Sequence, residues 1–305
     1  MYFDRPALKA EARRAMRTTR PRPMLVTLLY LLLTTGLSTL ISIIITVPMT
    51  LFAELTDQGL NPGSALLVTL RDIGPIGLFL HLLVALFGVV LSFGYSQWAL
   101  SASRGEKASF SDLVSGFSMV GKVLWLSILL LLCELLLRIF FAMAAQLAML
   151  PFLWIPVLNY VAAIVFPSAA TLIPSLLMLW YTMSAYCLLD DPESGAFLAM
   201  RRSRQLMRGH IGDLILLYLS FVGWFLLAVA LTVVAVLCFG IPIGYAMSTP
   251  DAGTTAFIYC IIPAAVSLLS LLLLGLWLIP YLTISECKFY DRLPRTQSDA
   301  PPFDL

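Results

Sequence analysis

Long apolar stretches alternate with short polar segments along the whole chain, and this alternation predicts membrane-spanning helices. A helix needs about 20 consecutive apolar residues to cross the hydrocarbon core of a bilayer. Six stretches reach that length: Met24–Val47, Ile76–Ala99, Val123–Leu147, Val161–Leu189, Leu214–Ala246 and Phe257–Ile284. We therefore predict an all-α fold, a polytopic transmembrane helical bundle with six spans, in which residues 1–305 form a single membrane domain.

The fourth stretch is the least regular of the six. Four prolines lie between Leu150 and Pro174, and each of them removes a helical hydrogen bond. We interpret Pro151–Tyr160 as a re-entrant or interfacial piece, two alternatives between which the sequence does not decide, and place the start of the span after it. A seventh complete span in this region is the competing count.

The distribution of Lys and Arg orients the predicted bundle. The amino-terminal arm, the loop after the second span, the loop after the fourth span and the carboxyl-terminal tail carry seven, three, four and three of the 19 basic residues. Because positively charged loops stay on the cytoplasmic side, both termini are predicted to lie in the cytoplasm. A seven-span count would place the loop with four arginines outside, so the charges reject it.

Composition agrees with this class of protein, since 60% of the residues are hydrophobic and only 12% are charged. Soluble domains average about 45–50% apolar and about 25% charged residues. The five cysteines form no CxxC pair, so we expect neither a disulfide framework nor a zinc site.

A short polar element precedes each pair of predicted spans. The first is a basic amphipathic arm at residues 1–22, and the second is Ser109–Phe117, where Ser109 and Asp112 form a variant capping box. In the third element, Asp191 is the predicted helix N-cap and Gly209 the predicted carboxyl-terminal stop. A helical wheel places one group of its side chains on one face (Ala196, Ala199, Met200, Ser203, Leu206 and Met207) and Arg201, Arg204 and Arg208 on the other.

The second span of each pair closes on a similar motif, a tyrosine followed by small or hydroxyl-bearing residues. The three motifs are YSQWALS from Tyr95, YTMSAYC from Tyr181 and YLTISEC from Tyr281. We predict three tandem units at residues 1–103, 104–190 and 191–290, each an amphipathic helix followed by a helical hairpin, with a flexible cytoplasmic tail at 291–305. The alternative is that interfacial helices and tyrosines are common to any six-span protein.

Glu134 and Arg138 are the most informative charged residues within the spans. They lie four residues apart in the third span, so they share one helix face and form a potential intramembrane ion pair. A charge at membrane depth is costly unless it is paired, which makes the pair a functional candidate. We favour a structural role, because a charge that already has a partner is poorly placed to bind a ligand.

Other candidates for chemistry have simpler explanations. We expect His81 to be an interfacial or packing histidine, with a proton relay as the alternative. Asp190 and Asp191 resemble a catalytic or metal-binding carboxylate pair, but the N-cap accounts for Asp191. Motifs for nucleotide binding, metal-dependent hydrolysis and a serine nucleophile are absent from the sequence. We therefore predict a non-enzymatic protein with no catalytic residue, no cofactor and no metal.

The arginine clusters indicate a membrane surface. Each cluster adjoins a span, so the anionic lipids of the inner leaflet explain the clusters without a nucleic acid partner. We expect contact with anionic lipid from Arg13, Arg17, Arg201, Arg204 and Arg208.

The segment Leu176–Leu227 carries several linked motifs. They are a tyrosine-rich span end, an Asp-x-Pro turn at Asp190–Pro192, a basic helix ending in Met-x-Gly at Met207–Gly209, and a Leu-Ser-Phe-x-x-Trp sequence at Leu219–Trp224. This region resembles the signature region of the bacterial membrane proteins catalogued as domain of unknown function 975. The sequences RPALKAEARRAM, FGYSQWALSASRGEKASFSDLVSGF and IPYLTISECKFYDRL are also similar to that family.

The resemblance implies a shared fold and a multi-pass protein of the bacterial cytoplasmic membrane, and it implies no activity. Two segments depart from the family pattern, the proline-rich insert Pro151–Pro174 and the outer segment Cys238–Thr255. Both lie outside the motifs that carry the resemblance.

Two functional hypotheses follow. The first is an intramembrane cavity for a lipid, a peptide or a small hydrophobic molecule, with a role in transport or lipid handling. It is motivated by the repeat and by the proline-broken stretch, since irregular backbone at membrane depth usually lines a cavity. The second is a scaffold or accessory subunit that docks a membrane or cytoplasmic protein partner through its basic helices. A polar-lined cavity would favour the first hypothesis, and a closed, tightly packed bundle the second.

Overall fold

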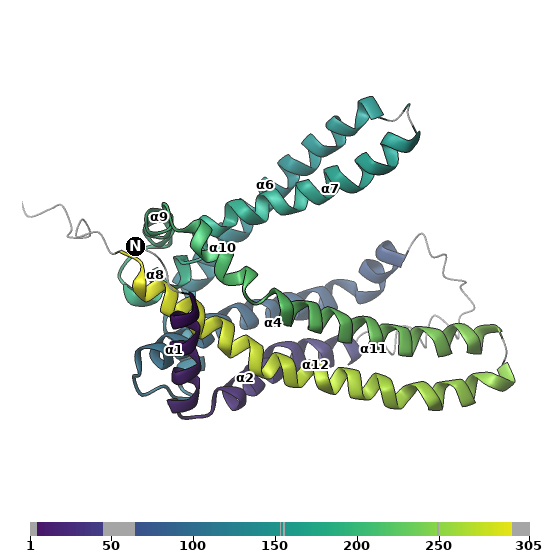
Figure 1. Ribbon diagram of the computed structural model, residues 1–305, viewed down its shortest axis with the longest axis horizontal. Helices are drawn as coiled ribbons and strands as arrows, with labels where there is room; N and C mark the ends of the chain where they lie inside the picture. The colour runs from purple at the N-terminus through teal and green to yellow at the C-terminus, as the bar shows by residue number, and fades with distance from the viewer. Residues whose placement is uncertain (1–4, 45–64, 153, 155, 249, 295–305) are drawn as a thin grey trace, which may run out of the picture. The chain divides into compact units, whose positions relative to one another are not determined.

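The computed structural model describes residues 5–44, 65–152, 154, 156–248 and 250–294. Every regular element in these ranges is a helix, which confirms the predicted all-α fold (Figure 1). In chain order the elements are α1 (Arg5–Thr18), α2 (Pro23–Leu31), the π-helix η1 (Leu32–Gly36), α4 (Ala65–Arg104), α5 (Asp112–Ser115), the 3-10 helix η3 (Gly116–Met119), α6 (Val120–Met149), the 3-10 helix η4 (Leu150–Phe152), α7 (Pro156–Met178), the 3-10 helix η5 (Leu179–Tyr181), α8 (Ser184–Asp190), α9 (Ala196–Leu206), α10 (Ile211–Leu219), α11 (Val222–Ser248) and α12 (Pro250–Arg292). Residues 37–44 continue the helix that begins with α2 and η1.

Within the described ranges, five helices are long and apolar enough to cross a membrane. They are Pro23–Ile44, Phe79–Arg104, Asp112–Phe152, Leu158–Asp190 and Ala265–Arg292. The bent pair formed by α10 and the first part of α11 becomes a further candidate if the two helices are counted as one span. The chain therefore has the helices of a membrane protein.

The stretch Leu214–Ala246, which we predicted as one regular span, is broken in the structure. α10 and α11 meet at an angle of 46°. At the break, the amide of Phe221 donates to the carbonyl of Tyr218 (2.9 Å), a residue only three positions back. Breaks of this kind occur at small residues such as Ser, and here Ser220 directly precedes Phe221.

The segment Pro151–Tyr160, which we predicted as a re-entrant or interfacial piece, is partly helical in the structure, and its place in the membrane stays a prediction. α6 and α7 form a helical hairpin (Figure 1), η4 lies in its connection, and α7 already begins at Pro156. Pro156 occupies the first position of the helix, where a missing amide hydrogen costs nothing. α7 continues through Pro167 and Pro174, as apolar membrane helices often do.

Asp191 is not the N-cap of the basic helix, so this prediction is wrong. α9 begins at Ala196, Gly195 occupies its N-cap position, and Asp191 is the C-cap of α8. The physical reason is an extra turn between the two helices, in which the amide of Ser194 donates to the carbonyl of Asp191 (3.1 Å). Asp191 precedes a proline and adopts φ −133° and ψ 83°, as expected for a residue in that position.

The chain forms two compact units, which are discontinuous in sequence. The first comprises residues 1–28, 101–108 and 212–292, and the second comprises 29–100, 109–211 and 293–305. These boundaries differ from the three predicted tandem units, which stay a prediction. Most of the predicted flexible tail, residues 291–305, lies outside the described residues.

The first unit is organised around the hairpin of α11 and α12, with α1 packed against α12 (Figure 1). The docked face of α1 buries Leu8 and Ala12. The ammonium group of Lys9 donates to the carbonyl of Ser220 (2.8 Å) at the helix break and lies 4.1 Å from the centre of the Phe221 ring. Partial burial, and secondarily the nearby charge of Arg13, lower the pKa of Lys9.

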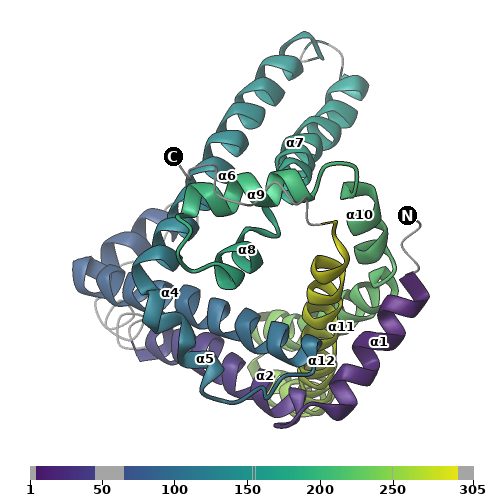
Figure 2. The same cartoon turned by 90° about the vertical axis from the view of Figure 1, so that its left-hand side faces the viewer.

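The second unit contains the α6–α7 hairpin, the short helices α5, α8 and α9, and most of the first two candidate spans. α9 contacts both α6 and α8 (Figure 2). The buried face of α9 consists of Ala196, Ala199, Met200 and Ser203. The hydroxyl of Ser203 donates to the carbonyl of Trp180 (2.9 Å), which fixes α9 against η5.

Candidate functional site

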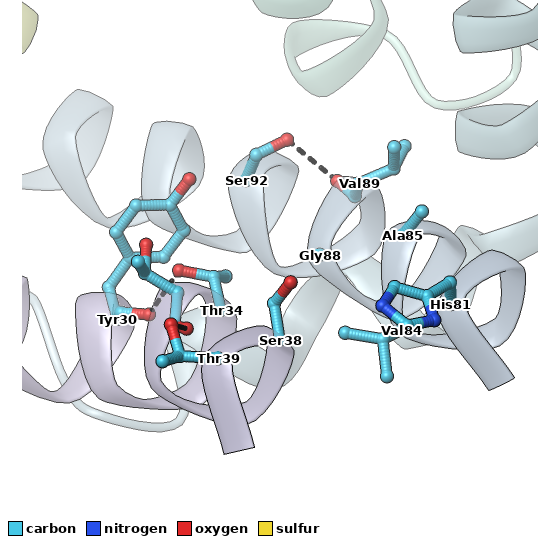
Figure 3. Close-up of a pocket in the computed structure, with 11 residues that line it drawn as sticks. Tyr30, Thr34, Ser38, Thr39, His81, Val84, Ala85, Gly88, Val89 and Ser92 are labelled. Atoms are coloured by element: carbon cyan, nitrogen blue, oxygen red, sulfur yellow. Dashed lines mark hydrogen bonds between the residues drawn. The ribbon is translucent and has the colours of Figure 1, made fainter. Parts of the chain in front are cut away.

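A pocket with a volume of about 770 Å³ lies between the first two candidate spans of the second unit (Figure 3). One wall consists of the helix formed by α2, η1 and residues 37–44, and the other wall is α4. Seven of the eleven lining residues carry a hydroxyl or an imidazole: Tyr30, Thr34, Thr35, Ser38, Thr39, His81 and Ser92. The remaining four are Val84, Ala85, Gly88 and Val89 of α4. We call this site the hydroxyl-lined pocket.

The π-helix η1 shapes the first wall of the hydroxyl-lined pocket. The amide of Leu37 bonds to the carbonyl of Leu32, five residues back, so the helix is wider here than a regular α-helix. This wider turn contributes Thr34 and Thr35 to the lining. Single π-turns inside α-helices are rare and occur frequently at functional sites.

Three of the six hydroxyl protons among the lining residues are already used within the helices. Thr34 donates to the carbonyl of Tyr30 (2.8 Å), Thr39 donates to the carbonyl of Thr35 (2.8 Å), and Ser92 donates to the carbonyl of Val89 (2.7 Å). Because a hydroxyl has a single proton, the oxygens of these three donors remain available as hydrogen-bond acceptors. These three side chains therefore offer acceptors to a ligand.

His81 lies in the wall formed by α4. Its Nδ1 is 2.9 Å from the carbonyl of Gly77 and its Nε2 is 3.1 Å from Oγ of Ser42. A carbonyl only accepts, so Nδ1 must carry a proton. The hydroxyl of Ser42 also lies 2.9 Å from the carbonyl of Ser38. Both ring nitrogens thus lie within hydrogen-bond distance of a partner, in a polar pocket where the sequence predicted an interfacial or packing residue.

Stacked aromatic rings support one end of the pocket. The ring of Tyr30 stacks on Tyr95 with 4.7 Å between centroids, and Tyr95 lies 5.5 Å from Trp98. Tyr95 and Trp98 are buried. Tyr95, the first tyrosine of the predicted repeat, therefore positions a residue of the pocket wall without lining the pocket itself.

Two glycines hold α5 against α4. A Cβ atom on Gly94 would lie 2.0 Å from the carbonyl oxygen of Leu113, and one on Gly116 would lie 2.5 Å from the carbonyl oxygen of Val90. No side chain fits at such distances. The backbone contact fixes the segment that precedes α6 against the helix that forms one wall of the pocket.

The other two tyrosines of the predicted repeat lie outside the pocket. Tyr281 is buried in the first unit, where its hydroxyl accepts a hydrogen bond from Nε of Arg13 (3.1 Å) and its ring meets Phe221 edge-on at 5.0 Å. Tyr181 is half-buried in η5, directly after the Trp180 carbonyl that receives Ser203.

Glu134 and Arg138 form an ion pair on α6. The distance between Nη2 of Arg138 and Oε1 of Glu134 is 2.6 Å, and Nε of Arg138 lies 2.9 Å from the same oxygen. The arginine side chain is 46% exposed and the glutamate side chain 37% exposed. Neither residue lines the hydroxyl-lined pocket.

The arginines predicted to contact lipid have different surroundings. Arg201, Arg204 and Arg208 are exposed, as is Arg17 on α1. Arg13 is exposed as a residue, but its guanidinium bonds to Tyr281 and lies 5.7 Å from the centre of that ring. Contact of these residues with anionic lipid stays a prediction.

Asp191 holds the turn before α9 instead of capping that helix. Its carboxylate accepts a hydrogen bond from the guanidinium of Arg202. This hydrogen bond, together with the charge of Arg202 and the backbone N–H groups of Ser194 and Glu193, keeps the pKa of the Asp191 carboxyl below its usual range. Within the described residues, no group of three or more His, Cys, Asp or Glu side chains is placed to hold a metal ion.

The sequence carried a signal for the pocket that we did not use. Tyr30, Thr34, Ser38 and Ser42 recur every four residues, so they form a polar stripe along an otherwise apolar helix. A polar stripe in a span faces a neighbouring helix or a cavity. Only the pairing with α4 shows that this stripe faces His81 and Ser92.

Comparison with known proteins identifies a family and no relative of established function. No curated protein and no solved structure matches the chain. One family model, described as "Protein of unknown function (DUF975)", matches residues 1–297, which confirms the resemblance found in the sequence. The chain therefore belongs to this family of proteins of unknown function.

Proposed function

We propose that this protein is a non-enzymatic membrane protein that holds the head group of a lipid or another amphiphile in the hydroxyl-lined pocket, with a role in transport or lipid handling. The observation that carries the proposal is a polar pocket of about 770 Å³ between two helices that are otherwise apolar enough to span a membrane. Polar groups at membrane depth are costly and mark ligand pathways.

Apolar surface beside the pocket suits the chain of an amphiphile. Leu82, Leu83 and Leu86 follow His81 on α4, and their exposed fractions are 56%, 51% and 38%. Thr35, Thr39 and Ala85 of the lining are exposed as well, so the pocket is accessible from outside the helix pair. An amphiphile would place its head among the hydroxyls and its chain along these leucines.

We further propose six spans with both termini in the cytoplasm of a bacterial cell. The bent pair of α10 and α11 counts as one span in this topology, and the basic residues of the loops supply the orientation. The pocket then runs from Tyr30 towards the outer face near His81.

The contacts of the polar elements support three tandem units. Each element packs against the end of a different candidate span: α1 against α12 near Tyr281, α5 against α4 at Gly94, and α9 against η5 at Trp180. In each case the contact lies at, or next to, a tyrosine motif. A threefold repeat explains this pattern. In the first two units the span end would contact the polar element of the following unit, and in the third unit it would contact α1 of the first.

A second candidate function is a scaffold that docks a partner through its basic helices. Phe197 is 67% exposed and lies on the same face of α9 as Arg201 and Arg204, and Arg208 follows in the turn after this helix. An exposed aromatic residue beside three arginines also suits an anionic membrane surface. The two surfaces are separable: replacing the three arginines with Gln should weaken hydrogen-exchange protection of α9 in anionic bilayers but not in neutral ones, and an equal loss in both would favour a protein partner.

Filling the pocket tests the proposed function. A Cβ atom on Gly88 would lie 4.0 Å from Cγ2 of Thr34, an ordinary contact, so Gly88→Leu keeps the backbone in place and extends into the pocket. Gly223→Leu is the matched control, because a Cβ atom there would meet nothing within 4 Å.

We expect the purified full-length protein to retain a defined class of amphiphile, measured by mass spectrometry of extracted lipids relative to protein. Gly223→Leu should retain the same amount and Gly88→Leu far less. Equal retention by all three proteins would overturn the proposed function.

A further inference from the structure

We infer that the ligand of the hydroxyl-lined pocket is an uncharged amphiphile whose head group donates hydrogen bonds, as a long-chain alcohol or an acylglycerol does. This inference rests on the proposed function and adds the chemical class of the ligand. It follows from what the lining residues offer and from what they lack.

The eleven described residues of the lining carry no fixed charge that could neutralise a charged head group. None of the eleven residues is Asp, Glu, Lys or Arg. Burying an unpaired phosphate, carboxylate or ammonium group away from water is strongly unfavourable. The lining therefore disfavours both anionic and cationic heads.

His81 offers no free N–H group to a charged head group. Its two ring nitrogens already lie within hydrogen-bond distance of the Gly77 carbonyl and the Ser42 hydroxyl. An imidazolium would direct both of its N–H groups at these partners, so neither N–H would remain for an anionic ligand. His81 thus lines one side of the pocket with a hydrogen-bond partner at each ring nitrogen.

Three side chains of the lining instead present acceptors. Thr34, Thr39 and Ser92 donate their protons to carbonyls of their own helices, which leaves their oxygens facing a ligand that brings its own protons. Figure 3 shows these side chains on both walls. Hydroxyl and amide groups are the uncharged groups that donate to such oxygens.

The length of the lining suits a head group with several hydroxyls. Thr39 lies nine positions after Tyr30, which corresponds to about 14 Å along a helix. Hydroxyl-bearing residues occur along this entire length, so a head with more than one donor satisfies more of the acceptors than a single alcohol does. Acylglycerols have such a head.

Photoreactive amphiphiles of equal chain length test this inference. Three diazirine-bearing probes are used, a monoacylglycerol, a fatty acid and an alkylamine, with the full-length protein in nanodiscs of uncharged lipid. Labelling is mapped by mass spectrometry to the peptides that contain residues 28–44 and 79–92. We expect the monoacylglycerol to label these peptides on the order of tenfold more than either charged probe, the effect of about one well-made hydrogen bond.

Two variants separate head-group recognition from general binding. Thr34→Val keeps the shape of the side chain and removes an acceptor, so it should lower the preference for the monoacylglycerol. Thr232→Val is the matched control, because Thr232 donates to the carbonyl of Ala228 in the same manner (2.9 Å) but lies on α11, outside the pocket. The preference should be unchanged in the control.

The possible results distinguish the inference from the proposed function. Equal pocket labelling by the three probes, or a preference for a charged probe, overturns the inference on the head group and leaves binding at the pocket intact. Labelling by none of the probes at these peptides overturns the proposed function as well. An equal loss of preference in Thr34→Val and Thr232→Val also overturns the assignment of the acceptors.

Discussion

The first and last pairs of candidate spans differ in what lies between their helices. In the first pair, the helix with η1 turns a stripe of hydroxyl residues towards α4, and a pocket remains between them. In the last pair, α11 and α12 are joined by aromatic rings, with Trp224 4.9 Å from Trp277 and Trp277 5.0 Å from Tyr281. Large rings fill the space that small hydroxyl residues leave open.

We infer that the first and last pairs of candidate spans have different roles, one in binding and the other in stability. Close packing of aromatic rings stabilises a hairpin through dispersion and buried area. Small polar residues contribute less packing. A helix pair lined by them is therefore less stable, but it leaves room for a ligand. We therefore expect substitutions in the last pair to change stability, and substitutions in the first pair to change binding.

The largest effect on stability is expected from Phe221→Ala. Phe221 is fully buried and contacts both Lys9 of α1 and Tyr281 of α12. Truncation of a buried phenylalanine costs about 3–5 kcal/mol. Thermal unfolding in detergent should show this loss, while retention of amphiphile by the folded fraction stays as in the wild type. Loss of the ligand from folded protein would break the division between the two pairs.

Gly94→Ala should have the next largest effect on stability, and this substitution lies in the first pair of candidate spans. The new methyl group would collide with the carbonyl of Leu113, and overpacking of this severity costs about 3 kcal/mol. Gly223→Ala, where a Cβ atom meets no neighbour within 4 Å, should change the free energy of unfolding by less than about 0.5 kcal/mol. If the two variants unfold at the same temperature, α5 does not rest on α4 as described.

The ion pair on α6 extends the comparison to a third pair of helices. Arg138→Leu leaves Glu134 without its partner, which costs about 2–3 kcal/mol for a charge near the centre of a membrane helix. Replacing both residues with Leu should restore most of the lost stability. A double variant that is no more stable than Arg138→Leu would show that the two charges do not depend on each other.

The smallest effect is expected at the turn before α9. Since Arg202 lowers the folded-state pKa of Asp191, this carboxylate stabilises the fold above its unfolded pKa of about 3.9, and the contribution is lost as the pH falls through the lower folded pKa. Hydrogen exchange of α9 should therefore be constant from pH 7 to about 5 and then lose protection in acid. Asp191→Asn should remove the acid-dependent part of this change, and an unchanged profile in that variant would rule Asp191 out as its source.

Apolar length and helical periodicity were sufficient to predict the helices of this fold. Each predicted stretch overlaps a helical candidate, because the length that a bilayer requires is a local property of the sequence. The break at Ser220–Phe221 was missed, since the same apolar residues suit a straight and a bent helix. The position of Asp191 was missed because a turn and an N-cap use the same residue types.

The pocket was harder to predict than the helices. Thr34 and Thr39 can satisfy their hydroxyls within their own helix, so the sequence alone gives no reason to look for a partner. The π-turn at Leu32–Gly36 leaves no clear pattern in the residues, and His81 becomes part of the site only through its position opposite Ser42. The proline-broken fourth stretch, which was one reason to predict a cavity, contains the helix α7.

The two histidines of the chain, His81 and His210, provide the most direct test of binding at the hydroxyl-lined pocket. Nuclear magnetic resonance of protein labelled with ¹⁵N at histidine, in nanodiscs, reports on the two rings separately, and His210→Gln assigns the signals. Addition of a monoacylglycerol should shift the signals of His81 in a saturable manner and leave those of His210 in place. Unchanged His81 signals, or equal shifts of both histidines, would contradict binding at this pocket.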